Sequence, residues 1–333
     1  MAIVGPPSPA GTGPTLPTTA GPRHAGLPKA HESLAAQAVI EKPWMFKALA
    51  VGTVLDVDVV DRLPQGSVRD FWTANGLYSG EGYNLSPGLE QRPADHLFSL
   101  PDFEIPESGF SIRPDELTTW RERHKRETAH FPRNERLYAA PLIIVPQTPH
   151  ESREQPKAFV SRRVAVAFSK SNYGFSAATS PDGQVIASAL YLALHSSLYQ
   201  HFCLMRSSRQ GASFRTILKE DVEAFPFPDP TRLSDADKRR TIELAQALET
   251  RVTKPWSEID DFIFSLYGLD EHDATVVRDT VTFSGPYRSI RQPAELPAGP
   301  EDLEMFRGYL EDMLQPLFQV ADQRCVIDRK SVV

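Results

Sequence analysis

The chain has little cysteine and no long apolar run, and each shortage excludes a class of protein. It contains two cysteines in 333 residues, Cys203 and Cys325, which are far apart in sequence. Cys203 falls inside an apolar pattern with helical spacing, which favours a buried free thiol over a disulfide. No run of about eighteen apolar residues exists, so the sequence predicts no membrane span. The first residues lack a secretory signal, and we therefore expect a cytoplasmic location.

The motifs of several catalytic classes are also missing. The sequence has no Gly-x-x-x-x-Gly-Lys-Ser/Thr, no His-Glu-x-x-His, no Cys-x-x-Cys and no Gly-x-Ser-x-Gly. Its one Pro-Pro pair is Pro6-Pro7, so it has no Pro-Pro-aromatic loop of the kind that holds a flipped base for amino-group methylation. The acid-x-Lys spacing of many metal nucleases occurs once, at Asp328–Lys330. We predict no catalytic, cofactor-binding or metal-ligating residue.

Two features that resemble functional sites have simpler interpretations. His195 and His201 are six residues apart, a spacing that does not place two ligands on one face of a helix. We interpret both as residues at the edge of the core. Gly76, Gly80 and Gly82 follow no apolar strand, so we interpret them as a turn instead of a cofactor loop.

The charge is unevenly distributed along the chain. The net charge is −7, yet residues 111–220 hold 16 Lys and Arg against 9 Asp and Glu. The segments 1–110 and 221–333 are both acidic, with 7 basic residues against 12 acidic and 13 against 22. A local positive field of this kind suits a phosphate backbone, although a charge-mixed solvated surface explains the same numbers.

Hydrophobic periodicity divides the chain into five segments. Residues 1–30 hold seven prolines and five glycines and are predicted to be a disordered leader. Short helices and loops are expected over 31–110, a recognition domain over 111–230, helices over 231–320, and a tail over 321–333. The predicted helices of the fourth segment begin near Ser234, Ser257, Glu271 and Glu301.

The middle segment combines strand and helix signals. Two apolar runs, Pro141–Pro146 and Arg163–Phe168, predict buried strands. A stripe of Ile186, Leu190, Leu194, Leu198 and Phe202 predicts one core helix of about twenty residues. We therefore predict an α+β fold, with a small mixed β-sheet and a long core helix followed by a helical C-terminal region.

Several short motifs occur in an order that resembles a known family. The resemblance covers roughly residues 35–285 and is to the C-terminal target-recognition region of N6-adenine DNA methyltransferases of the type IIG and related restriction–modification kind. The motifs that carry it are Lys42–Leu49, Phe131–Arg133, Tyr138–Ile144, Val164–Phe168, Leu194–Leu198, Asp221–Pro228 and Ile259–Leu269.

This resemblance implies a DNA-reading part without its catalytic half. In the family, the other half binds S-adenosylmethionine and transfers the methyl group, so no cofactor is expected in this chain. The expected partners are double-stranded DNA and a catalytic methyltransferase domain or subunit, in restriction–modification or phage defence. The chain then corresponds to a fragment or to the specificity subunit of a split system.

Two loops carry the predicted DNA contacts. Arginine suits phosphate and guanine, asparagine suits adenine, and glycine permits close approach of the backbone. One set flanks the second predicted strand, and the other follows the core helix. Together the predicted DNA-binding residues are Arg162, Arg163, Lys170, Asn172, Tyr173, Arg206, Ser207, Arg209, Gln210, Gly211 and Arg215.

Two other classes of function fit parts of the sequence. A protein-interaction scaffold of a defence complex, without direct DNA contact, would use the acidic C-terminal helices for docking. An independent small-molecule enzyme would need clustered acids or histidines, and the sequence shows none.

Overall fold

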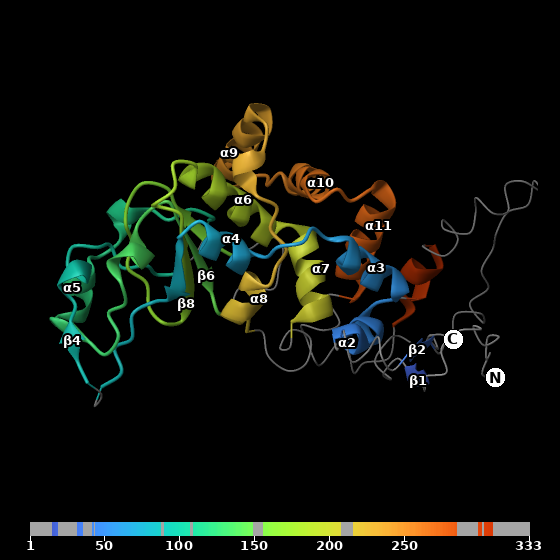
Figure 1. Ribbon diagram of the computed structural model, residues 1–333, viewed down its shortest axis with the longest axis horizontal. Coiled ribbons are helices and arrows are strands. Elements are labelled where there is room, and N and C mark those ends of the chain that lie inside the picture. Colours follow the sequence, from blue (N-terminus) through green and yellow to red (C-terminus); the bar gives the residue numbers. More distant parts are fainter. Residues whose placement is uncertain are drawn as a thin grey trace, which may run out of the picture.

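An antiparallel β-sheet lies at the centre of the computed structural model, between a helical layer and a lobe rich in loops (Figure 1). The α+β prediction is confirmed. The structure describes residues 15–18, 32–35, 42, 44–87, 90–106, 109–148, 156–207, 216–284, 299–301 and 303–308.

The central sheet has the strand order β3-β8-β6-β7, and each neighbouring pair is antiparallel, where a mixed sheet was predicted. Its strands are β3 (Tyr78–Glu81), β6 (Leu142–Pro146), β7 (Phe159–Ser161) and β8 (Asn172–Ser176). Two further pairs of short strands are β1 (Thr15–Thr18) with β2 (Glu32–Ala35) and β4 (Arg92–Pro93) with β5 (Thr128–Ala129).

Both faces of the central sheet are buried, so β6 is apolar throughout. Ile143 and Val145 point into the larger core, which the helices complete. Leu142 and Ile144 point into a second core beneath the loop lobe. This placement follows from the period of two along a strand, and it explains why the predicted Pro141–Pro146 run has no polar alternation.

Phe168 closes the second core. The two positions packed closest against it are glycines, because a larger side chain there would collide with Phe168. A Cβ on Gly174 would lie 2.2 Å from Cζ of Phe168, and one on Gly82 would lie 2.0 Å from its carbonyl oxygen. Gly82 and Gly174 are therefore sites where a side chain is sterically excluded. The ring lies under the sheet where β8 has no side chain to interfere.

The helical layer packs on the other face of the sheet, with α6 at its centre (Figure 1). All residues of α6 except Gln184 are buried, because β6 and β7 lie on one side and α9 on another. The helices of this layer are α4 (Val68–Ala74), α6 (Gly183–His195), α7 (Ser197–Arg206), α8 (Lys219–Glu223), α9 (Asp235–Thr250), α10 (Trp256–Leu266) and α11 (Glu271–Asp279).

A smaller helical group extends the molecule beyond α7. Helices α2 (Trp44–Val51) and α3 (Val54–Arg62) pack against α7 around Val57, Leu204 and Met205. The remaining elements are α5 (Trp120–His124), η1 (Asp95–Leu97), η2 (Pro114–Glu116), η3 (Glu135–Tyr138), η4 (Pro230–Arg232) and the π-helical η5 (Thr280–Ser284).

Two predictions about secondary structure are wrong. The predicted single core helix is divided at Ser196, where an extended backbone ends α6 and begins α7. The predicted strand at Arg163–Phe168 is a connection between strands, in which Arg163 and Val164 are exposed while Val166, Ala167 and Phe168 enter the second core individually. The strands on either side of it are β7 and β8.

Other predictions at this level are confirmed. Ser234 begins α9, Gly268 with φ +69° follows α10, and Cys203 is a buried free thiol whose pKa burial raises to about 12. His195 and His201 were expected at the edge of the core, but both are buried inside it, at 1% and 0% exposure. The predicted leader 1–30 and tail 321–333 lie almost wholly outside the described residues, and the five-segment division stays a prediction.

Candidate nucleic-acid interface

The structure brings part of each of the two predicted sets of DNA-binding residues together. Lys170, Asn172 and Tyr173 lie at the end of the sheet where Pro146 pairs with Asn172. Arg206 and Ser207 end α7. The segment that begins α8 touches both groups, so residues distant in sequence form one surface.

The contact with the first group runs through Gln147, which follows β6. Its backbone amide donates to the Ser171 carbonyl over 3.0 Å, and its side-chain amide donates to the Lys170 carbonyl over 2.7 Å. The amide of Ile217 then donates to the Gln147 carbonyl over 2.8 Å. The chain that returns after residue 215 is therefore fixed beside Lys170.

The contact with the second group runs through Asp221. Its Oδ2 atom accepts from the Ser207 hydroxyl and from the backbone amide of Leu218, each over 2.9 Å. Ser207 precedes residues 208–215 and Leu218 follows them. One carboxylate therefore joins the two ends of this connection, and α8 begins at the point of closure.

Arg206 is held in place by two aromatic rings. Its guanidinium carbon lies 5.3 Å from the ring centre of Trp44 and 5.4 Å from that of Phe202. Burial lowers the pKa of Arg206, and Asp61 acts in the opposite direction. Lys47 donates to the carbonyls of Cys203 and Ser207, so a second cation meets the C-terminal end of α7, where positive charge is favourable.

Lys170, Asn172 and Tyr173 differ in exposure. Lys170 is exposed, while Asn172 and Tyr173 are 6% and 4% exposed. Burial raises the pKa of Tyr173, and the nearby acids Glu81, Glu220 and Asp221 add to this effect. The Oδ1 atom of Asn172 is buried and has no hydrogen-bond partner among the described residues. Of these three residues, only Lys170 is charged, and its side chain is exposed to solvent.

Arg162 and Arg163 lie at the opposite end of the sheet, where Leu142 pairs with Ser161. The Arg162 guanidinium donates to Glu249 on α9 and, over 3.1 Å, to Ser188 on α6. This places Arg162 in a structural role that links the sheet to two helices. Arg163 is exposed. The DNA contact of either arginine stays a prediction, and the two do not join the surface around Asp221.

The other four predicted residues, Arg209, Gln210, Gly211 and Arg215, lie outside the described residues. The described chain fixes where their segment begins and ends, at Ser207 and Thr216.

The Phe-Pro-Phe-Pro segment after α8 has the scaffold role that its sequence predicts. Phe225 is fully buried against Tyr199, Phe202 and Tyr267, and Phe227 packs on Phe71 and Trp72. The Phe225 carbonyl accepts from the Val68 amide over 2.9 Å, and the Phe227 amide donates to the Gly66 carbonyl over 3.0 Å. The segment therefore ties α8 to α4.

Glu223 strengthens the same connection. Its side chain is 7% exposed and pairs with Arg69 of α4 over 2.9 Å and with Lys219. Burial would raise the pKa of Glu223, but Lys219 and Arg69 hold it below its usual value. The position of α8, and hence of Asp221, is fixed by a buried charge and two buried rings.

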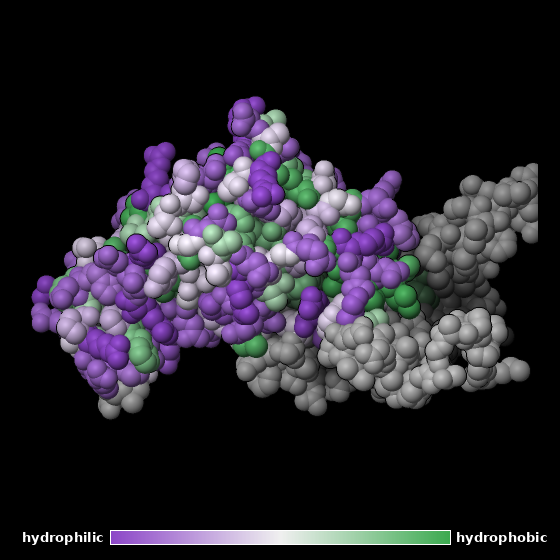
Figure 2. All heavy atoms as spheres, in the orientation of Figure 1, coloured by the Kyte–Doolittle hydropathy of each residue, from purple (hydrophilic) through white to green (hydrophobic). Residues whose placement is uncertain are grey.

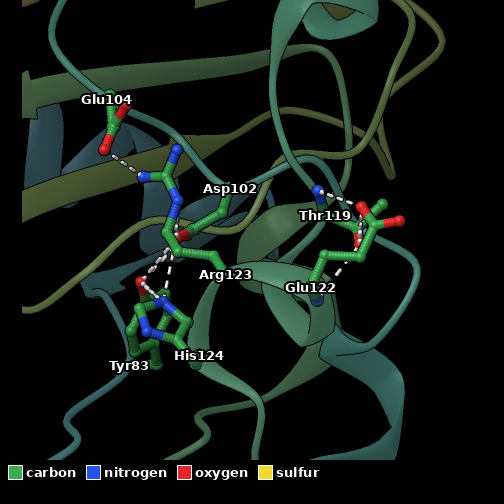
Figure 3. A network of polar contacts seen from close by, with 7 residues as sticks. All are labelled: Tyr83, Asp102, Glu104, Thr119, Glu122, Arg123 and His124. Carbon is green, nitrogen blue, oxygen red and sulfur yellow. Dashed lines mark hydrogen bonds and ion pairs between the residues drawn. The ribbon is translucent and has the colours of Figure 1, made fainter.

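A polar network centred on Asp102 lies under the loop lobe and was not predicted from the sequence (Figure 3). The Asp102 carboxylate is 1% exposed and accepts from the Tyr83 hydroxyl over 2.9 Å. His124 Nε2 lies 2.9 Å from both Asp102 Oδ2 and the Tyr83 hydroxyl. Arg123 approaches the same carboxylate at 3.4 Å and pairs with Glu104 at 2.7 Å.

This network attaches α5 to the second core. Burial raises the pKa of Asp102, against the opposing effect of Tyr83, His124 and Arg123. The Thr119 hydroxyl and Glu122 complete a capping box at the start of α5, visible beside the network in Figure 3. Two charged residues of α5, Arg123 and His124, therefore face inward and contact Asp102.

The described residues contain no group of three or more His, Cys, Asp or Glu placed to hold a metal ion, and none of their helices is long and apolar enough to span a membrane. A small pocket between α6 and α10 is lined by apolar side chains and Tyr267, whose hydroxyl donates to the Pro226 carbonyl over 2.8 Å.

Comparisons with known proteins find a distant structural neighbour among the solved structures. No protein-family model matches the chain, and no curated protein matches it. Among solved structures, the type IIG restriction endonuclease BpuSI aligns with a TM-score of 0.31 and 11% sequence identity. The alignment covers 46% of this chain and 17% of that chain.

Proposed function

We propose that this chain binds double-stranded DNA as the target-recognition part of a site-specific adenine-N6 DNA methyltransferase system. S-adenosylmethionine and the methyl transfer belong to a separate catalytic half. The observation that carries this proposal is the closure at Asp221, which joins Ser207 at the end of α7 to Leu218, beside the contact of Ile217 with Gln147 at the end of the sheet near Lys170. The motif order of the sequence supports the same function.

The charges on this surface suit a polyanion. Lys170 is exposed, Arg206 is directed by two rings, and the connection between Ser207 and Thr216 contains Arg209 and Arg215 in its sequence. Arginine and lysine neutralise backbone phosphates and release counterions, so binding of this kind weakens as salt rises. Backbone contacts position a protein on DNA, and contacts to base edges add specificity.

The test is the affinity of the full chain for a fluorescently labelled duplex, measured by anisotropy across a series of salt concentrations. We expect binding at low salt that weakens steadily as salt rises. Replacing Arg206, Arg209 and Arg215 by Gln removes up to three phosphate contacts and should reduce the slope of log K against log salt by about 0.9 for each. Undetectable binding, or binding independent of salt, contradicts the proposal.

A control removes two exposed arginines that lie away from this surface. Arg232 is 86% exposed near η4, and Arg251, which follows α9, is 53% exposed. The double change Arg232→Gln and Arg251→Gln should leave the salt slope unchanged. If the chain is instead a scaffold without DNA contact, both sets of variants will behave alike and neither will bind duplex.

A further inference from the structure

The loop lobe carries an exposed aromatic ring flanked by two arginines, at the end of the molecule that contains α5 and β4 (Figure 1). Phe131 is 36% exposed, although it is a large apolar side chain. The guanidinium carbons of Arg92 and Arg133 lie 5.7 Å and 5.1 Å from its ring centre. Figure 2 shows hydrophilic side chains over most of this end.

The backbone beneath this ring is held firmly. Phe131 and Asn84 exchange two backbone hydrogen bonds of 2.9 Å and 3.2 Å, and the His130 amide also donates to Asn84. The Pro132 carbonyl accepts from the Tyr138 hydroxyl over 2.9 Å. The exposed ring is therefore presented from a fixed backbone and does not belong to a loosely attached loop.

Arg133, whose guanidinium contacts the ring, has an unusual backbone conformation. Its φ is +67°, a value that few residues other than glycine adopt. Its Nε donates to the Gly82 carbonyl over 3.1 Å, which directs the guanidinium across Phe131. Uncommon backbone angles of this kind occur often at binding sites.

The acidic partners of the two arginines are easily displaced. Arg92 pairs with Glu90 at 3.6 Å, and Arg133 with Glu81 at 3.2 Å. The side chains of Glu90 and Glu81 are 75% and 48% exposed, and ion pairs in water contribute little free energy. A phosphate can replace either carboxylate, because a guanidinium binds phosphate through two parallel hydrogen bonds.

We propose that Arg92, Phe131 and Arg133 form a second DNA contact, which binds the sugar–phosphate backbone outside the segment held near Asp221. This inference rests on the proposed function. In Figure 1, β4 and α8 both lie along the lower side of the molecule, so a duplex placed along that side would meet both surfaces. The ring holds the guanidiniums in place, and the contact is independent of base sequence.

The test uses the full chain and duplexes of two lengths, about 12 and about 30 base pairs, with anisotropy measured across a salt series. For the long duplex, Arg92→Gln with Arg133→Gln should reduce the salt slope by about two, which corresponds to two lost phosphate contacts. For the short duplex the same variant should behave as the original chain. Phe131→Leu should weaken long-duplex binding in the same direction.

Controls separate this contact from effects on folding and on overall charge. Arg92→Lys with Arg133→Lys should retain the slope, and the thermal melting of each variant shows whether it is folded. The pair Arg232→Gln and Arg251→Gln removes the same charge elsewhere. An unchanged slope on the long duplex, or an equal loss in this control, overturns the second contact while leaving the proposed function intact. Absence of duplex binding at both lengths overturns both.

Discussion

His195 is a buried residue whose chemistry makes the protein sensitive to acid. Its Nδ1 lies 2.8 Å from the Tyr191 carbonyl, and its Nε2 accepts from the Lys157 amide over 3.0 Å. The neutral ring satisfies both contacts, whereas a protonated ring would direct an N–H at an N–H. Burial, chiefly, lowers the pKa of His195 to about 3.

This lowered pKa predicts a loss of stability between pH 6.5 and pH 3. In that window the unfolded chain binds a proton at His195 and the folded chain does not, so the free energy of unfolding falls as pH falls. The contribution is about 1.4 kcal/mol for each pH unit at most. We expect His195→Gln to flatten this dependence in urea denaturation at pH 7 and pH 5. If the free energy of unfolding of this variant changes between pH 7 and pH 5 as much as that of the original chain, His195 is not the cause of the pH dependence.

Single residues also show the limit of what the sequence can predict. The burial of Phe225 and Phe227 was predictable, because each is followed by a proline that keeps the chain extended, and large apolar rings on such a segment pack against the core. The role of Arg162 was not predictable, because its partner Glu249 is 87 residues away. A charged residue beside a strand has the same local pattern whether its partner is a helix or DNA.

At the scale of elements, the division of the long helix depends on Ser196. Apolar residues recur every four positions through this point, so periodicity alone predicts one helix. The Ser196 hydroxyl donates to the Ala193 carbonyl over 2.7 Å and accepts from the Tyr199 amide over 3.2 Å. Asp260 then fixes the next residue through the Ser197 amide and hydroxyl. Asp260 belongs to α10 and is 63 residues from Ser197, so the local sequence could not predict this contact.

Removal of the Ser196 hydroxyl should therefore destabilise the protein measurably. We expect Ser196→Ala to lower the free energy of unfolding by about 1 to 2 kcal/mol, since it deletes the cap of a buried helix. Urea denaturation measures this as a shift in midpoint at constant slope. Ser234→Ala, which removes the more exposed cap of α9, should cost less. If Ser196→Ala destabilises the protein no more than Ser234→Ala does, the contacts of Asp260 alone determine where α6 ends and α7 begins.

The misplaced strand has a different physical cause. Arg163–Phe168 has the composition of a strand, but its apolar residues fill the second core from a connection. The true strand β8, Asn172–Ser176, contains Asn, Gly and Ser, which favour turns. Gly174 is required because Phe168 occupies the space beside it. Here a packing contact between two segments, and not local strand propensity, determines which segment forms the strand.

At the scale of the whole molecule, Asp221 joins the end of α7 to the start of α8 at the proposed DNA surface. We expect Asp221→Ala to weaken duplex binding about tenfold, or ~1.4 kcal/mol, because the connection after Ser207 must then be ordered on binding. Anisotropy titration at fixed salt measures this change.

Asp237→Ala is the matched control, because Asp237 accepts from the Ser234 hydroxyl over 2.7 Å in the same way at the start of α9. It removes an equivalent cap far from the proposed surface and should leave affinity unchanged. Equal affinities for the two variants would disprove the coupling.

The closure at Asp221 also bears on how such a protein can diversify. Ser207 and Leu218 are held together by Asp221, which lies outside the connection between them, so the closure does not depend on the sequence of residues 208–215. The entropy cost of closing a loop grows slowly, by about 0.6 kcal/mol for each doubling of its length. Insertions and substitutions at 208–215 could therefore accumulate at little cost to folding, which would allow a change of DNA target without a change of scaffold.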